Sequence, residues 1–428
     1  MSLLSKESFR EAQPSELSLF ELPPTQTAVE RVVFEEHRPI STLSGMSLIK
    51  FHISGQNSMD YIDLKRSRLH VKAKIKTASN ENMAASEKTG PVNLFFHATF
   101  GQIDVFLSGK LVPSNTNNYP YKAMFLTLLN YGEDAKSSQL LSQLFIEDEG
   151  GVMDDSDPAG GNTGLYERAK YTSESKTVDM SGPILHDLFC QDRFLLNQVD
   201  IQVRLYRTKP SFCIMSKETT PDYHVEIQDI VLEACKLKLN PAVIYGHAEI
   251  LKTVTAKYPY TKTEVKMMSI PTGNVSFVWD NMFQGNAPSR VIIAFARSNA
   301  ISGDYKKNPF NFLNLDITQL HLTCDGVTVQ GSGPEKLNFS SSNGEIMVTP
   351  FINMFQTADM WGNNDGNNLT RKDFISGYTL FCFDLQPVFG QRSSFLKLLK
   401  KGNVRLEVQF GTALSETVSC IVYSETPA

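Results

Sequence analysis

The chain has 428 residues, of which 41% are hydrophobic and 20% are charged, and its net charge is −5. This is the composition of an ordinary globular protein, and the length leaves room for two domains of about 200 residues. The negative net charge argues against a protein whose main function is to bind nucleic acid. The chain has no apolar run of about eighteen residues, so no membrane-spanning helix is predicted.

Residues 1–40 have weak periodicity, and a Pro-Pro pair at Pro23 and Pro24 interrupts them. We expect an extended N-terminal arm that lies on a partner or under the body. The first twenty residues lack the apolar core of a signal peptide, which predicts a protein made inside the cell and not secreted. Six cysteines lie far apart, mostly in apolar strand contexts, and are expected to be reduced core residues.

Residues 41–216 are predicted to form the first β domain. Strand candidates alternate between apolar and polar residues, as half-buried antiparallel strands do. A Ser-Gly hairpin is followed by a helix that has Pro in its first turn, and an acidic, glycine-rich stretch is the clearest candidate for a surface loop. In chain order these segments are Ser47–Ser54, Leu69–Thr77, Val92–Leu107, the hairpin Ile103–Val112, the helix Tyr119–Gly132, the loop Glu147–Gly164 and the terminal strands in Asn197–Ser216.

Residues 223–428 are predicted to form the second β domain, with an insertion around residues 241–304. Its segments follow a similar order, with an Asp-Gly turn in the hairpin and another helix that has Pro in its first turn. They are the strand Tyr223–Leu239, the helix Ala242–Val254, the strand Arg290–Ala296, the hairpin Leu320–Val329, the helix Thr349–Gly362, the strand Gly377–Leu385 and the terminal strands in Asn403–Ser424.

Four pairs of segments echo one another in the same order, which indicates one β unit used twice. The hairpins correspond, and so do the helices after them. The strands around Cys213 and Cys420 close the two units, and VKAKIK from Val71 echoes CKLKLN from Cys235. Strands dominate and helices lie in connections, so the fold class is all-β, with two consecutive sandwiches.

No catalytic, cofactor-binding or metal-binding residue is predicted, and the chain is not expected to be an enzyme. The acids Asp154, Asp155 and Asp157 could hold calcium but lack the glycine and terminal glutamate of an EF-hand loop, so a solvated loop is preferred. A basic run could face phosphate, but a solvated or subunit-facing strand is preferred. It comprises Lys65, Arg66, Arg68, Lys72, Lys74 and Lys76.

Six segments that spread over most of the chain carry a resemblance to a known family. They are Leu17–Glu30, Asp60–Ile75, Gly90–Gly109, Asn118–Gly132, Tyr305–Phe312 and Gly377–Leu385. In these segments the chain resembles the double jelly-roll major capsid proteins of Polinton (Maverick) elements and adintoviruses.

The resemblance implies two consecutive jelly rolls and a homotrimer that forms a pseudohexameric capsomer of an icosahedral, DNA-containing virion. It also implies a separate single jelly-roll penton protein at the vertices. Long loops would crown the trimer, with Glu147–Gly164 and residues 241–304 as the candidates. The pairs Gly150-Gly151 and Gly160-Gly161 resemble double-glycine protease sites, although a plain loop is preferred.

The alternative is a non-viral carbohydrate-binding double β-sandwich module. Such modules usually stack sugars on clustered aromatic side chains beside carboxylates. This chain has only two tryptophans, Trp279 and Trp361, so its supply of stacking surfaces is small.

Overall fold

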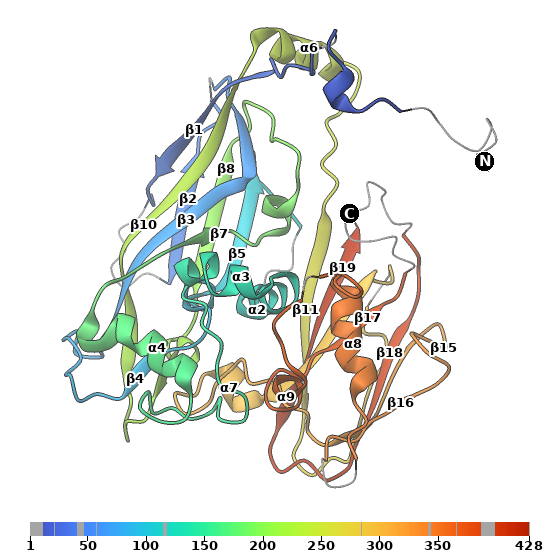
Figure 1. The fold of residues 1–428 in the computed structure, drawn as a ribbon. Coiled ribbons are helices and arrows are strands. Elements are labelled where there is room, and N and C mark those ends of the chain that lie inside the picture. The colour runs from blue at the N-terminus through green and yellow to red at the C-terminus, as the bar shows by residue number, and fades with distance from the viewer. Residues whose placement is uncertain are drawn as a thin grey trace.

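Two eight-stranded antiparallel sandwiches stand side by side in the computed structural model (Figure 1). The structure describes residues 12–20, 22–40, 47–56, 58–113, 118–283, 285–340, 344–364, 366–386 and 399–427. Within these ranges, none of the helices is long and apolar enough to cross a membrane.

The first sandwich has two four-stranded sheets. If its main strands are numbered along the chain, the sheet orders are 1-8-3-6 and 2-7-4-5, which is the jelly-roll order. One sheet is β1 (Val29–His37), β10 (Tyr223–Leu239), β3 (Tyr61–Thr77) and β7 (Val178–Pro183). The other is β2 (Leu48–Ile53), β8 (Ile201–Arg207), β5 (Phe100–Leu107) and β6 (Lys110–Leu111). A two-stranded sheet of β4 (Thr89–Pro91) and β9 (Ile214–Ser216) lies apart from both.

The second sandwich repeats this order strand for strand, so the chain is a double jelly roll, as predicted. One sheet is β11 (Thr261–Ile270), β19 (Val418–Pro427), β13 (Arg290–Arg297) and β17 (Phe381–Asp384). The other is β12 (Ser276–Trp279), β18 (Val404–Phe410), β14 (Ile317–Cys324) and β15 (Val327–Thr328), with β16 (Glu335–Lys336) pairing to β14.

Helices lie in the connections between strands. In each jelly roll a longer helix follows the hairpin, as the sequence predicts: α2 (Tyr119–Asn130) after β6, and α8 (Val348–Thr357) in the connection that leads to β17. The others are α1 (Phe95–Ala98), α3 (Glu133–Lys136), α4 (Thr163–Thr172), α5 (Pro210–Cys213), α6 (Pro241–Leu251), α7 (Ser298–Ser302) and α9 (Arg371–Ile375).

The boundary between the two units differs from the predicted one. Strand β10, expected to open the second unit at residue 223, pairs with β3 along almost its whole length and completes the first jelly roll. Residues 261–297 are not an insertion either, because they supply β11, β12 and β13 of the second jelly roll. Helix α6 and the segment after it therefore connect the two units.

This topology changes two of the predicted repeat pairs. The echo between Val71 and Cys235 joins neighbouring strands of one sheet, β3 and β10, so it is not a repeat of the unit. Cys420 lies in the last strand β19, but Cys213 ends helix α5, ahead of the true counterpart β10. The paired hairpins and the paired strands β8 and β18 are confirmed.

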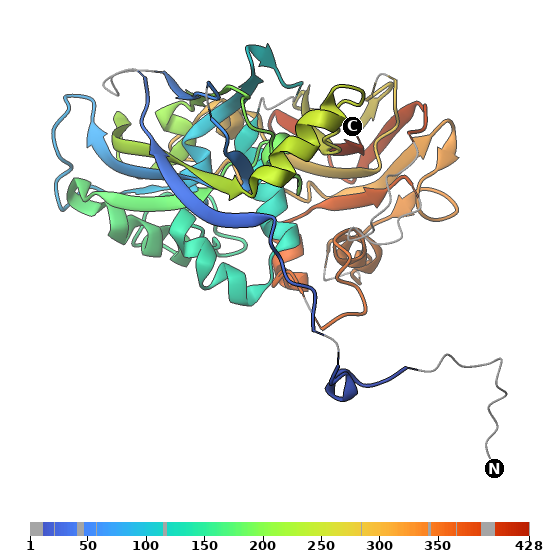
Figure 2. The same ribbon diagram turned by 90° about the horizontal axis from the view of Figure 1, so that it is seen from above.

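The N-terminal arm also differs from its prediction. Residues 29–37 are strand β1, which pairs with β10 at the edge of the first sheet, so only the part before it extends from the body (Figure 2). All six cysteines are free thiols, and four of them are buried.

Candidate functional site: the junction between the two jelly rolls

The two inner strands of the sheet β11-β19-β13-β17, β19 and β13, are buried on both faces. Seven of the eight residues of β13 are buried, and seven consecutive residues of β19 are buried as well. In the matching sheet of the first jelly roll, β3 instead alternates between buried and more exposed residues from Leu69 onward. Continuous burial means that something covers the outer face of the second sheet.

Helix α2 of the first jelly roll provides that cover. Its Phe125 ring lies 5.2 Å from the Phe312 ring and 6.1 Å from the Tyr423 ring of β19. Its Tyr121 ring lies 5.7 Å from that of Phe310. All five aromatic side chains are essentially inaccessible to water. Since each buries on the order of 150–250 Å² on folding, the centre of the junction is a continuation of the hydrophobic core.

Asp148 is the centre of a buried polar network at the edge of this contact. Its carboxylate forms an ion pair with Arg168 of α4, and both side chains are fully buried. It also accepts hydrogen bonds from Asn162 and, across the junction, from Asn308, each at 2.9 Å. The Tyr378 hydroxyl donates to the Asp148 carbonyl at 2.9 Å. Every polar partner of this carboxylate is thus fixed by a rigid element.

The loop Glu147–Gly164 carries this network, so it is partly buried and not the wholly solvated loop that its composition predicts. Its ends meet: a Cβ atom added to Gly164 would lie 2.1 Å from the carbonyl oxygen of Glu147, which only glycine permits. Between them Met153 is buried, and the Gly151 amide donates to the Ser376 carbonyl at 2.6 Å. The loop forms a wedge between the two jelly rolls.

A second buried ion pair links the units on another side of α2. Lys122 of α2 contacts Asp187 at 2.6 Å, with 2% and 0% of their side chains exposed. Asp187 also accepts two hydrogen bonds from Thr263 of β11, one from its amide and one from its hydroxyl. Burial raises the pKa of Asp187, but Lys122 and Thr263 lower it more, so the net shift is downward.

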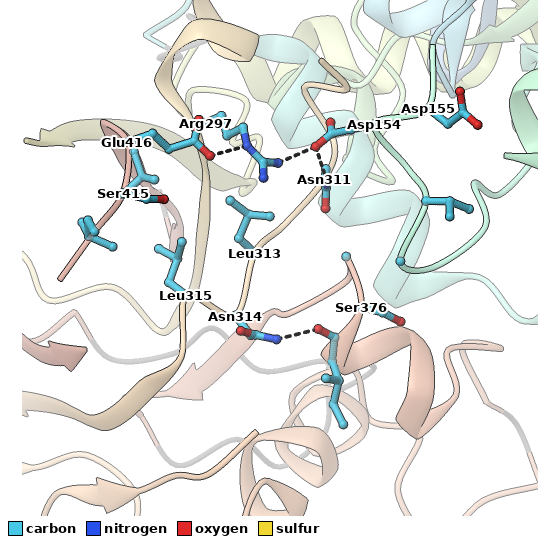
Figure 3. A pocket seen from close by; sticks show the side chains of 16 residues that line it. Asp154, Asp155, Arg297, Asn311, Leu313, Asn314, Leu315, Ser376, Ser415 and Glu416 are labelled. Carbon is cyan, nitrogen blue, oxygen red and sulfur yellow. Dashed lines mark hydrogen bonds and ion pairs between the residues drawn. The ribbon is translucent and has the colours of Figure 1, made fainter. Parts of the chain in front are cut away.

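A polar groove of about 550 Å³ opens beside the wedge (Figure 3). Arg297 lies across it and forms ion pairs with Asp154 of the wedge and with Glu416 of the second jelly roll. Asn311 donates a further hydrogen bond to Asp154 at 3.0 Å. Arg297 therefore bridges a carboxylate of the wedge and one of the second jelly roll, and the arrangement is suited to holding two parts together.

The acids considered for calcium diverge to different partners. Asp154 contacts Arg297, Asp155 accepts from the Gly161 amide at 2.8 Å, and Asp157 contacts Lys88 and Lys217 at 2.8 and 3.0 Å. Burial alone would raise the pKa of Asp157, but the two lysines lower it to about 2. Across the described part of the chain, no group of three or more acids, histidines and cysteines could hold a metal ion.

The basic run follows β3 along the outer face of the first sheet. Arg68 contacts Glu233 and Lys76 contacts Glu226, both on the neighbouring β10. Lys65 contacts Asp192. Since acids of adjacent elements balance part of this run, the face has mixed charge and is not a phosphate-binding surface of one sign.

The other sequence candidates do not form the sites considered for them. The Gly161 amide donates to Asp155, and the Gly151 amide donates to Ser376 of the second jelly roll, so neither glycine pair lies in a free loop. Trp279 is buried against Phe277, while Trp361 is 57% exposed, so the two indoles form no common stacking surface. Sequence reasoning missed Asp148 and Asn308, although the unbroken apolar run of β13 hinted that its sheet would be covered.

Comparisons with known proteins support the same architecture. No family model matches the chain. The uncharacterized protein F54H12.2 of Caenorhabditis elegans is 25% identical over 386 residues, which cover 87% of this chain and 88% of that protein. A chain of the Sputnik virophage, solved by cryo-EM, has a TM-score of 0.65 at 12% identity and covers 98% of this chain and 90% of its own. The Faustovirus major capsid protein has a TM-score of 0.58 at 8% identity, with 97% and 92% covered.

The chain has the fold of a viral major capsid protein. Because the match to this capsid fold covers nearly all of each chain, it includes both jelly rolls and their placement beside each other. The junction that fixes this placement is therefore the part of the capsid fold on which the shape of the subunit depends.

Proposed function

We propose that the chain is a major capsid protein. Three copies form a pseudohexameric capsomer, and capsomers tile an icosahedral shell around double-stranded DNA. The observation that carries this proposal is the rigid pairing of two complete jelly rolls through a buried junction, in the placement that known capsid proteins share. A shell needs subunits of constant shape, and a junction with a buried aromatic centre and two buried ion pairs supplies it. The role is structural and not catalytic.

The internal repeat supports a ring of three chains. Within one chain, α2 of the first jelly roll packs on the sheet β11-β19-β13-β17 of the second. Among the described residues, no comparable packing joins the equivalent helix α8 of the second jelly roll to the equivalent sheet β1-β10-β3-β7 of the first. If α8 packs on that sheet in the next copy, the same contact recurs, and six jelly rolls in three chains close a ring.

The two surfaces left over have the properties of an interface. Val32 and Phe34 of β1 are 42% and 48% exposed, in a strand that otherwise carries charges. On the other side, Val348 in the first turn of α8 and Trp361 beyond its end are exposed. Apolar and aromatic side chains surrounded by charge are typical of the core and rim of a protein interface.

The resemblance of the sequence also indicates which kind of genetic element encodes the chain. We infer a Polinton-like (Maverick) or adintovirus-like origin, and a relative in a nematode is consistent with an element carried in animal genomes. A separate single jelly-roll penton protein would fill the vertices. The chain would be located in the virion. Its acidic net charge of −5 leaves DNA condensation to other proteins.

Light scattering on the purified protein, with negative-stain images of the same sample, tests the proposal. The expected species has three chain masses and a hexagonal outline, and closed shells would agree as well. A compact monomer at high concentration that binds glycans would contradict the proposal and favour the carbohydrate-binding alternative. Tight, salt-sensitive binding of capsomers to duplex DNA would contradict the part that concerns DNA.

A further inference from the structure

An apolar groove of about 290 Å³ lies between α6 and the first jelly roll. Its walls include Ile250, Leu251 and Val254 from the end of α6 and beyond it, together with Phe194 of the first jelly roll. All four side chains are at least 40% exposed. In bulk water this volume corresponds to on the order of ten molecules, and displacing them from an apolar lining is favourable.

The polar atoms in the groove are already paired. The Tyr61 hydroxyl and His247 Nδ1 are 2.9 Å apart, and the Tyr258 hydroxyl accepts from the Leu196 amide at 3.0 Å. Arg193 donates to the carbonyl of Lys257 at 2.6 Å, and both side chains are exposed at the rim. The groove therefore offers an apolar floor and a positively charged edge.

The N-terminal arm leaves the body at the same end of the molecule (Figure 1). The Asn240 amide, just before α6, donates to the Ala28 carbonyl at 2.9 Å, which ties the base of the arm to the start of this helix. Beyond this point the arm points away from the body in both views (Figures 1 and 2). Its apolar residues Leu17, Leu19 and Phe20 are 58%, 75% and 98% exposed, and they lie beside the acidic Glu16.

We propose that residues Ser15–Phe20 of one copy occupy the α6 groove of a neighbouring copy in the capsomer. Apolar arm residues would cover the apolar floor, and Glu16 would lie near Arg193 and Lys257 at the rim. The eleven residues between Leu17 and Val29 can extend roughly 40 Å. That reach is similar to the diameter of a compact 200-residue unit, whose radius of gyration is roughly 16 Å. If the threefold axis of the trimer runs parallel to the long axes of the jelly rolls, the arm and the groove of every copy lie at the same height along that axis.

This inference rests on the proposed trimer and is tested by cross-linking two singly substituted chains. One chain carries Leu19→Cys and a first affinity tag; the other carries Ile250→Cys and a second tag. Both also carry Cys190→Ser, because Cys190 is exposed. After co-expression and mild oxidation, we expect a covalent dimer with both tags, at a yield at least ten times that of a control pair. The control combines Leu19→Cys with Val278→Cys, an exposed apolar residue of the second jelly roll.

Four other results would overturn the proposal. Equal yields for the two pairs would mean that the arm has no preferred groove. An internal cross-link in a chain carrying both substitutions, without the mixed dimer, would mean that the arm lies in its own groove. Trimers by light scattering under reducing conditions, with no cross-link at all, would reject the arm contact and leave the capsid function intact. The absence of any multimer would reject both.

Discussion

Asn308 of the second jelly roll donates its side-chain amide to the carboxylate of Asp148 in the first, at 2.9 Å. The same carboxylate neutralises Arg168, whose guanidinium also donates to the Pro91 carbonyl at 3.0 Å. One buried anion thus joins the wedge and helix α4 within the first unit and connects both to the second. Removing it would affect the fold of the first unit and the angle between the units together.

Replacing Asp148 with alanine is expected to destabilise the protein by about 3–5 kcal/mol, because Arg168 would keep a buried charge without a partner. Urea unfolding measures the loss. Glu149→Ala is the matched control, since Glu149 is the next residue of the wedge and is exposed; it should change stability by no more than about 0.5 kcal/mol. Equal effects of both substitutions would show that the network is not a source of stability.

Replacing Phe34 with glutamate is expected to prevent trimer formation without unfolding the chain. Phe34 is half exposed on β1, and a charge at the centre of an interface costs binding energy that a charge facing water does not. Light scattering gives the mass, and circular dichroism gives the melting temperature. Val327→Glu, at the tip of the exposed β14–β15 hairpin, should leave the trimer intact. A trimer that forms with Phe34→Glu would exclude this face as the contact.

Acid is expected to destabilise the protein through His97. Burial lowers the pKa of this histidine from 6.5 to about 4, although its hydrogen bond to Gln143 raises it slightly. Between pH 6.5 and 4, His97 is therefore protonated in the unfolded chain but stays neutral in the folded protein. The free energy of unfolding consequently falls as pH falls, by about 2 kcal/mol at pH 5. Urea unfolding at pH 7.5 and 5 measures this slope.

The control for this slope is a pair of variants. His97→Gln should make the pH dependence shallower, whereas His52→Gln, at a partly exposed ring, should not. If both variants keep the full slope, another group is responsible. The best candidate is His186, whose pKa burial lowers to about 3, with a smaller contribution from Lys122.

Glu335 is expected to make the folded protein less stable as pH rises. Burial raises its pKa from 4.5 to about 7, and none of the described residues forms a hydrogen bond with its Oε2 atom. Between pH 4.5 and 7, the Glu335 carboxyl stays protonated in the folded protein but is ionised in the unfolded chain. The stability that comes from its neutral form is therefore lost as pH rises through 7. Glu335→Gln should therefore stabilise the protein at pH 8 by about 1–2 kcal/mol, allowing for partial exposure. Glu174→Gln, at an exposed site, should have no effect.

Much of the fold was predictable, because alternation and turn chemistry are local signals. Leu69, Val71, Ala73 and Ile75 point inward in β3 as predicted, and the Asp-Gly hairpin joins β14 to β15. The unit boundary was not predictable in the same way. β10 pairs with a strand more than 140 residues before it, and no local pattern states which partner a strand takes.

The junction was hidden from sequence reasoning for a related reason. The loop Glu147–Gly164 is acidic and rich in glycine, which is typical of a solvated loop. Its burial depends on Asn308, Arg297 and Tyr378, which lie more than 140 residues away and belong to the other jelly roll. A buried carboxylate and an exposed one look alike until their partners are known.

The double burial of β13 and β19 has a consequence for synthesis. The outer face of these two strands is apolar and has no charged alternation to keep it in water by itself. The first jelly roll, with its charged outer face, leaves the ribosome earlier and carries α2, the element that covers this face. Since domains generally fold in the order of their synthesis, we expect the first half of the chain to present a folded surface on which these strands of the second half can pack.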